Sequence, residues 1–215
     1  MPEATLPVIF ATAFVVALSG AMMPGPLLAV TISQSVRRGF WAGPQLILGH
    51  GILELALIAA LGAGLSGLID NKLVPAVVGM AGGTILLAMG SLTIRRVWQK
   101  ITLPAAASGT GRSRVLVLSG ILVSLSNPYW LIWWITIGMT YLLWSLNLGI
   151  AGVASFFSGH ILADLAWYAL VAFVVATGRR VMNDTVYRMV LLVCGLALIA
   201  LGVYFITSGA RFFAG

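Results

Sequence analysis

The sequence predicts an all-α integral membrane protein with six transmembrane helices, arranged as two inverted three-helix repeats. Three observations lead to this fold class. Apolar residues make up 60% of the chain and charged residues only 8%, with a mean hydropathy of +1.07, whereas soluble domains carry about 25% charged residues. Six apolar runs are long enough to cross a bilayer, and the basic residues gather in alternate loops between those runs.

The six runs each reach the length of about 20 apolar residues that a helix needs to cross the hydrocarbon core. They cover residues 7–33, 41–68, 73–94, 115–143, 148–177 and 186–208. The longest loop separates the third run from the fourth, is basic and rich in small residues, and is expected to be a flexible cytoplasmic linker. The predicted organisation is a first three-helix repeat at 1–94, the linker at 95–114 and a second repeat at 115–215.

Orientation follows from the basic residues, because cytoplasmic loops carry an excess of Lys and Arg. One side of the predicted bundle holds only Lys72 and Arg211. The loops of the other side hold ten: Arg37, Arg38, Arg95, Arg96, Lys100, Arg112, Arg114, Arg179, Arg180 and Arg188. Both termini are therefore expected outside, in a multi-pass protein of the cell (inner) membrane. Because the net charge of +7 is confined to these loops, nucleic acid is not an expected partner.

Two proline motifs interrupt the first and fourth apolar runs, in "MMPGPLL" (22–28) and "SLSNPYW" (124–130). Proline lacks an N–H and clashes with the preceding turn, so Pro24, Gly25 and Pro26 should unwind the first helix. Asn127 and Pro128 should kink the fourth in the same way. Lipid cannot satisfy the freed backbone groups, so such breaks belong beside protein or a cavity. There they offer N–H groups and a helix N-terminus to a substrate carboxylate.

Each half also carries a histidine followed by an acid four residues later, in "GHGILE" (49–54) and "GHILAD" (159–164). Residues four apart share one helix face, so His50 lies beside Glu54, and His160 beside Asp164. Inverted repeats recur in secondary transporters, whose sites lie near mid-membrane. We expect these four residues to form a proton-coupling or substrate site. Two alternatives stay open: an interhelical hydrogen-bond clasp, and a set of ligands for a divalent cation.

Aromatic residues cluster after the second break, at Trp130, Trp133, Trp134, Tyr141 and Trp144. Their expected role is to face lipid or to anchor the helix at the membrane interface. Trp130 and the neighbouring Tyr129 could instead line a cavity, because both lie beside the kink.

Enzymatic function is not expected. No Ser or Cys nucleophile is paired with a base, His-x-x-x-Glu lacks the second histidine of a zinc-hydrolase helix, and "GTGRS" (109–113) lacks the spacing of a phosphate-binding loop. The sequence therefore predicts no catalytic residue, no cofactor and no resident metal.

The stretch "MPGPLLAVTISQSVRRGFWAGPQLILGHGILELALI", followed by a basic linker, "SLSNPYW" and "GHILADLAWY", resembles the LysE/RhtB family of bacterial amino-acid exporters. The similarity extends over nearly the whole chain. It implies a permease driven by the proton gradient that exports amino acids or related small metabolites, with a homodimer as a candidate assembly. One departure is Tyr129, at a position where many members carry lysine.

The predicted mechanism is alternating access between the two repeats. A zwitterionic substrate would rest its carboxylate near Pro24–Pro26 and Asn127, and its ammonium group would be balanced by Glu54 or Asp164. Protons entering from outside would then release the substrate, with the two histidines as relays. The alternative function is export of a divalent metal cation through the same His/acid pairs.

Overall fold

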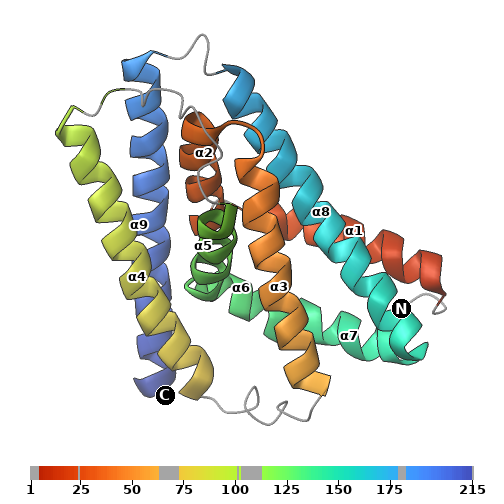
Figure 1. Cartoon of the computed structure of the whole chain (residues 1–215). Helices are drawn as coiled ribbons and strands as arrows, with labels where there is room; N and C mark the ends of the chain where they lie inside the picture. The colour runs from red at the N-terminus through yellow and green to blue at the C-terminus, as the bar shows by residue number, and fades with distance from the viewer. Residues whose placement is uncertain are drawn as a thin grey trace.

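Figure 1 shows the computed structural model of the chain, which describes residues 5–23, 25–62, 73–100, 102, 113–178 and 183–214. Every element in this part is helical. The elements are α1 (Leu6–Ala21), α2 (Pro26–Arg38), α3 (Ala42–Gly62), α4 (Leu73–Trp98), α5 (Ser113–Leu125), α6 (Pro128–Trp133), the π-helix η2 (Trp134–Gly138), α7 (Met139–Leu146), α8 (Gly149–Gly178) and α9 (Asp184–Ala214).

The described helices are those of a multi-pass integral membrane protein. Among the described residues, four stretches could cross a bilayer by length and composition: α3, the continuous stretch of α6, η2 and α7, α8, and α9. If the bent pair α1 and α2 forms one span, the number rises to five. α5 is apolar as well but shorter. Large apolar side chains on the outside of the bundle, such as Val193 (64% exposed) and Leu143 (60%), suit contact with lipid. The predicted linker begins later than expected, because α4 continues through Trp98, and most of 95–114 lies outside the described residues.

The expected interruption of the first span is present. α1 ends at Ala21, α2 begins at Pro26, and the two helices are bent by 77°. Gly25 precedes α2 in an extended conformation (φ −154°), and Pro26 at the first helical position costs no hydrogen bond because that N–H has no partner in a helix. Pro24 lies outside the described residues, so its part in the break stays a prediction.

The expected interruption of the fourth span is a full break between two helices. α5 ends at Leu125, and α6 begins at Pro128. Asn127 caps α6, since its Oδ1 accepts a hydrogen bond from the backbone N–H of Tyr129 at 3.1 Å. A π-helical turn, η2, follows α6 and leads into α7. Prolines at two sequence positions thus produce two breaks, one in each half of the chain.

The helices pack in pairs that join the two halves, and glycines make the pairs close. α3 packs against α5, α1 against α8, and α4 against α9 (Figure 1). A Cβ at Gly49 would collide with the backbone carbonyl of Val117 in α5, and a Cβ at Gly159 with that of Phe10 in α1. Each histidine of the two pairs is therefore preceded by the glycine at which its helix meets a helix of the other half.

These contacts predict a large cost for a methyl group at Gly49. We expect Gly49→Ala to lower the free energy of unfolding by about 1–3 kcal/mol, because a side chain there forces two helix backbones apart. Among the described residues nothing lies within 4 Å of a Cβ built on Gly62 of the same helix. Gly62→Ala is therefore the matched control. Thermal unfolding of the two purified variants checks the prediction, and equal melting temperatures would contradict it.

Candidate functional site

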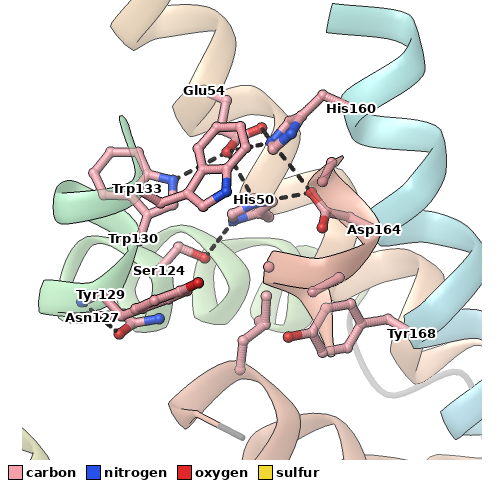
Figure 2. A pocket seen from close by; sticks show the side chains of 14 residues that line it. His50, Glu54, Ser124, Asn127, Tyr129, Trp130, Trp133, His160, Asp164 and Tyr168 are labelled. Carbon is pink, nitrogen blue, oxygen red and sulfur yellow. Dashed lines mark hydrogen bonds and ion pairs between the residues drawn. The ribbon is translucent and has the colours of Figure 1, made fainter. Parts of the chain in front are cut away.

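The centre of the bundle holds a cluster of four buried ionisable side chains, His50 and Glu54 from α3 and His160 and Asp164 from α8 (Figure 2). Glu54 has no exposed surface, and the other three residues are at most 7% exposed. The two predicted His/acid pairs therefore come together as one site. A charged residue at this depth costs about 2.5–3.5 kcal/mol on insertion scales, so its partners decide whether the bundle tolerates it.

The contacts within the cluster cross between helices as well as along them. His50 Nε2 lies 3.1 Å from Glu54 Oε1 on its own helix and 3.4 Å from Asp164 Oδ2 on α8. His160 Nε2 lies 2.9 Å from Glu54 Oε2 and 3.4 Å from Asp164 Oδ2. Each imidazole thus faces both carboxylates. The spacing of four residues, read from the sequence, correctly placed each pair on one face, and the crossed contacts come from the packing of α3 beside α8.

Neighbouring elements hold the cluster with three further hydrogen bonds. His50 Nδ1 and Ser124 Oγ of α5 are 2.8 Å apart. The indole N–H groups of Trp130 in α6 and Trp134 in η2 both donate to Glu54 Oε1, at 3.1 and 2.9 Å. These donors come from the second half of the chain, and Glu54 comes from the first.

The aromatic residues correct one sequence-based expectation. Trp130, Trp133 and Trp134 were expected to face lipid or the interface, with Trp130 as a possible cavity residue. All three are buried, at 9%, 6% and 1% exposure. Trp133 packs on the ring of His160, with 4.5 Å between ring centroids. The spacing i, i+3, i+4 marks one helix face, which was the signal available in the sequence.

The helix breaks lie next to the cluster. A Cβ built on Gly25 would lie 3.7 Å from Asn127 Nδ2, so the N-cap residues of α2 and α6 are neighbours. Asn127 and the cluster line one cavity of about 60 Å³, together with Ser124 and Tyr168. Pro26 is buried at the start of α2, and Pro128 begins α6. Sequence reasoning missed Ser124 and Tyr168, although Tyr168 follows Asp164 by one helical turn.

Buried acids and histidines beside broken helices, in the core of a multi-pass bundle, define a membrane transport protein. Comparison with known proteins gives the family: the chain belongs to the LysE type translocators, whose family model matches residues 18–209. Members of this family are transporters, which confirms the expectation that the protein is not an enzyme.

Among curated proteins, the chain is similar to one named "Putative amino acid efflux protein YcgF", from Bacillus subtilis (strain 168). The two are 24% identical over 208 residues, a match that covers 94% of this chain and 97% of that protein. No solved structure matches the chain.

The hydrogen bond between His50 and Ser124 predicts a specific loss of stability. Ser124→Ala leaves a buried ring nitrogen without its partner, so we expect the free energy of unfolding to fall by about 1–3 kcal/mol. Ser119 of the same helix is exposed and donates to the carbonyl of Val115 on its own helix. Ser119→Ala is the control and should change stability by no more than about 0.5 kcal/mol. Denaturation of both variants in mixed micelles makes the measurement, and equal losses would argue against a special role for Ser124.

Proposed function

We propose that the protein is a secondary transporter that exports amino acids or related small metabolites across the cell (inner) membrane. The observation that carries the proposal is the buried cluster of His50, Glu54, His160 and Asp164 within a chain of the LysE type translocator family. The name of the similar Bacillus subtilis protein, an amino acid efflux protein, supports the choice of substrate. The proposal includes a homodimer, which rests on the family resemblance and not on contacts within this chain.

The substrate carboxylate is proposed to bind between the two helix breaks. Gly25 is the N-cap of α2 and offers no side-chain hydrogen bond to the first N–H groups of that helix, so these donors suit an anion. Asn127 lies beside Gly25, and the side-chain amide nitrogen of Asn127 is directed toward Gly25. Pro26 begins α2 directly after the first break, Pro128 begins α6 directly after Asn127, and Pro24 is proposed to contribute to the first break. This arrangement supports a seat for a carboxylate at the cavity edge.

The substrate ammonium group is proposed to interact with Glu54 or Asp164, across the cavity from that seat. The cavity offers two carboxylates and aromatic faces to a cation, and the residues that line it include no Lys or Arg within the described chain. A cation in this position would be balanced by a carboxylate and by aromatic rings. Because Asn127 and the two acids line the same cavity, a zwitterion could contact both.

Alternating access is the proposed mode of transport. The cavity of about 60 Å³ has space for about four water molecules, so the helices must move before an amino acid can enter. The pairing of α3 with α5 and of α8 with α1, each at a glycine before a histidine, is the pattern that two inverted repeats would give. The 77° break between α1 and α2 offers a hinge.

Protons are the proposed coupling ion, carried by Glu54 and Asp164 with His50 and His160 as relays. Each imidazole lies within 3.4 Å of both acids. A proton taken up by the cluster therefore changes the charge that faces the substrate ammonium group. Proton and substrate thus compete for the same carboxylates. This competition couples the inward movement of protons to the outward movement of the substrate.

Transport by purified protein in liposomes tests the proposal. We expect Glu54→Gln and Asp164→Asn to reduce amino-acid export driven by a pH gradient at least tenfold, because amides keep the size of the acids but do not titrate. Asp184→Asn is the control, since Asp184 lies at the start of α9, 44% exposed and away from the cluster. Normal transport per folded molecule by both cluster variants would show that the cluster is only a structural clasp.

Topology is tested separately by labelling single cysteines in intact cells. A cysteine at position 108, in the predicted linker, should be reached only from the cytoplasm, and one at position 215 only from outside. This result is required if the second half of the chain enters the membrane inverted relative to the first. A C-terminus on the cytoplasmic side would overturn the inverted repeats.

A further inference from the structure

The four side chains of the central cluster have the composition and arrangement of a metal site. Their ligand atoms, two imidazole nitrogens and two carboxylate oxygens, all lie within 4.8 Å of one another. We propose that His50, Glu54, His160 and Asp164 bind one divalent transition-metal ion of the Zn²⁺ class, and that the bound ion blocks export. The binding stands by itself, and the block rests on the function proposed above.

The distances between ligand atoms fit a tetrahedral ion. Zinc binds imidazole nitrogen at about 2.0–2.1 Å and carboxylate oxygen at about 2.0–2.2 Å, which places neighbouring ligands of a tetrahedron about 3.3–3.4 Å apart. His50 Nε2 lies 3.1 Å from Glu54 Oε1 and 3.4 Å from Asp164 Oδ2, and His160 Nε2 lies 3.0 and 3.4 Å from the same two oxygens. Small movements bring these four distances to the ideal value. A single N–H cannot bond well to two carboxylates at once, whereas one central ion contacts all four groups.

Two carboxylate oxygens of the cluster point to the same conclusion. Glu54 Oε2 and Asp164 Oδ2 are buried and make no hydrogen bond within the described part of the chain. Glu54 and Asp164 are 0% and 5% exposed as whole residues. Glu54 Oε2 approaches an imidazole nitrogen to 2.9 Å without the geometry of a hydrogen bond. Buried anionic oxygens are costly when unpaired, and a cation between them removes that cost.

Hydrogen bonds outside the cluster orient the proposed ligands. Metal-binding histidines use their other ring nitrogen for a hydrogen bond that fixes the ring, and His50 Nδ1 is bonded to Ser124 in this way. Trp130 and Trp134 both donate to Glu54 Oε1, the oxygen that also faces both imidazoles, and so fix its position in the cluster. His160 is held instead by the ring of Trp133. Both α3 ligands are therefore fixed by groups from α5, α6 and η2.

The donor set selects the kind of ion. Imidazole nitrogens favour Zn²⁺, Co²⁺, Ni²⁺ and Cu²⁺, while Mg²⁺ and Ca²⁺ prefer sites built from oxygen. Two carboxylates and two neutral imidazoles carry a charge of −2, which a divalent ion cancels among side chains that are almost fully buried. The same carboxylates are proposed to hold the substrate ammonium group. An ion bound to both acids therefore excludes the substrate.

Cobalt(II) is the probe for binding, because its visible absorption is intense in tetrahedral sites and weak in octahedral ones. The full chain, purified in detergent and stripped with a chelator, is titrated with Co²⁺ in a Cys194→Ala background that removes the thiol on α9. We expect one equivalent to give the tetrahedral spectrum, and Zn²⁺ to abolish it. An octahedral spectrum, or no saturable binding, would overturn the proposal.

Variants in the same background assign the site. Asp164→Asn and His160→Gln should eliminate the tetrahedral spectrum, and Asp184→Asn should leave it unchanged. Ser124→Ala keeps all four ligands but frees the His50 ring, so it should weaken Co²⁺ affinity by about 10–100-fold. This variant keeps the test decisive if a ligand variant fails to fold. Full affinity in Ser124→Ala together with an unaltered spectrum in folded Asp164→Asn would place the metal elsewhere.

The block is tested in liposomes with amino-acid counterflow as the readout. Zn²⁺ at saturating concentration should stop counterflow by the wild-type chain. A tetrahedral spectrum without inhibition would keep the site and overturn the block. Accumulation of Zn²⁺ inside the liposomes would also keep the site, but would make the metal the cargo and overturn the amino-acid substrate. Absence of amino-acid transport in the presence of a tetrahedral spectrum would count against the proposed function alone.

Discussion

The fold depends on the pairing of one carboxylate, because Glu54 has no exposed surface at the centre of a membrane bundle. An isolated charge there would be far more costly than a buried hydrogen bond can repay, so the chain must surround it with donors. Two imidazoles and two indoles supply them, from α3, α6, η2 and α8. Helices from both halves of the sequence are therefore needed to make a single carboxylate tolerable.

The fold has a second requirement, close helix packing, because hydrogen bonds of about 3 Å between helices need backbones that approach closely. The glycines beside the two histidines satisfy it by letting α5 and α1 meet α3 and α8 without an intervening side chain. α4 and α9 use glycine in the same way, with Gly83 against Gly202 and Gly90 against Gly195. In lipid, packing of this kind replaces the hydrophobic effect as the force that joins helices. Close packing at glycines therefore both positions the site and stabilises the bundle.

Local physics made much of this arrangement predictable from the sequence. Runs of apolar residues placed the helices, prolines located the breaks at 22–25 and 126–127, and a spacing of four residues put each histidine beside its acid. The contacts of Trp134 and Ser124 were not predictable in the same way. An apolar run shows which residues are apolar but not which face meets protein instead of lipid, and a serine in such a run is usually bonded to its own helix. Those contacts depend on how α5 and α6 sit against α3, which is a tertiary property.

The π-helical turn η2 sets the rotational phase of the segment that carries the tryptophans. Besides Trp133 and Ser145, its buried residues form a row that recurs every four positions, at Trp130, Trp134, Gly138 and Leu142. In a regular α-helix each step of four residues turns the side chain by about 40° beyond a full circle, so three steps would carry the buried edge about 120° around the axis. A π turn accommodates roughly one residue more than an α turn and cancels about 100° of that drift. The buried edge therefore stays in line along the whole segment. The indoles that donate to Glu54 lie on this edge, together with the residues that pack against α8.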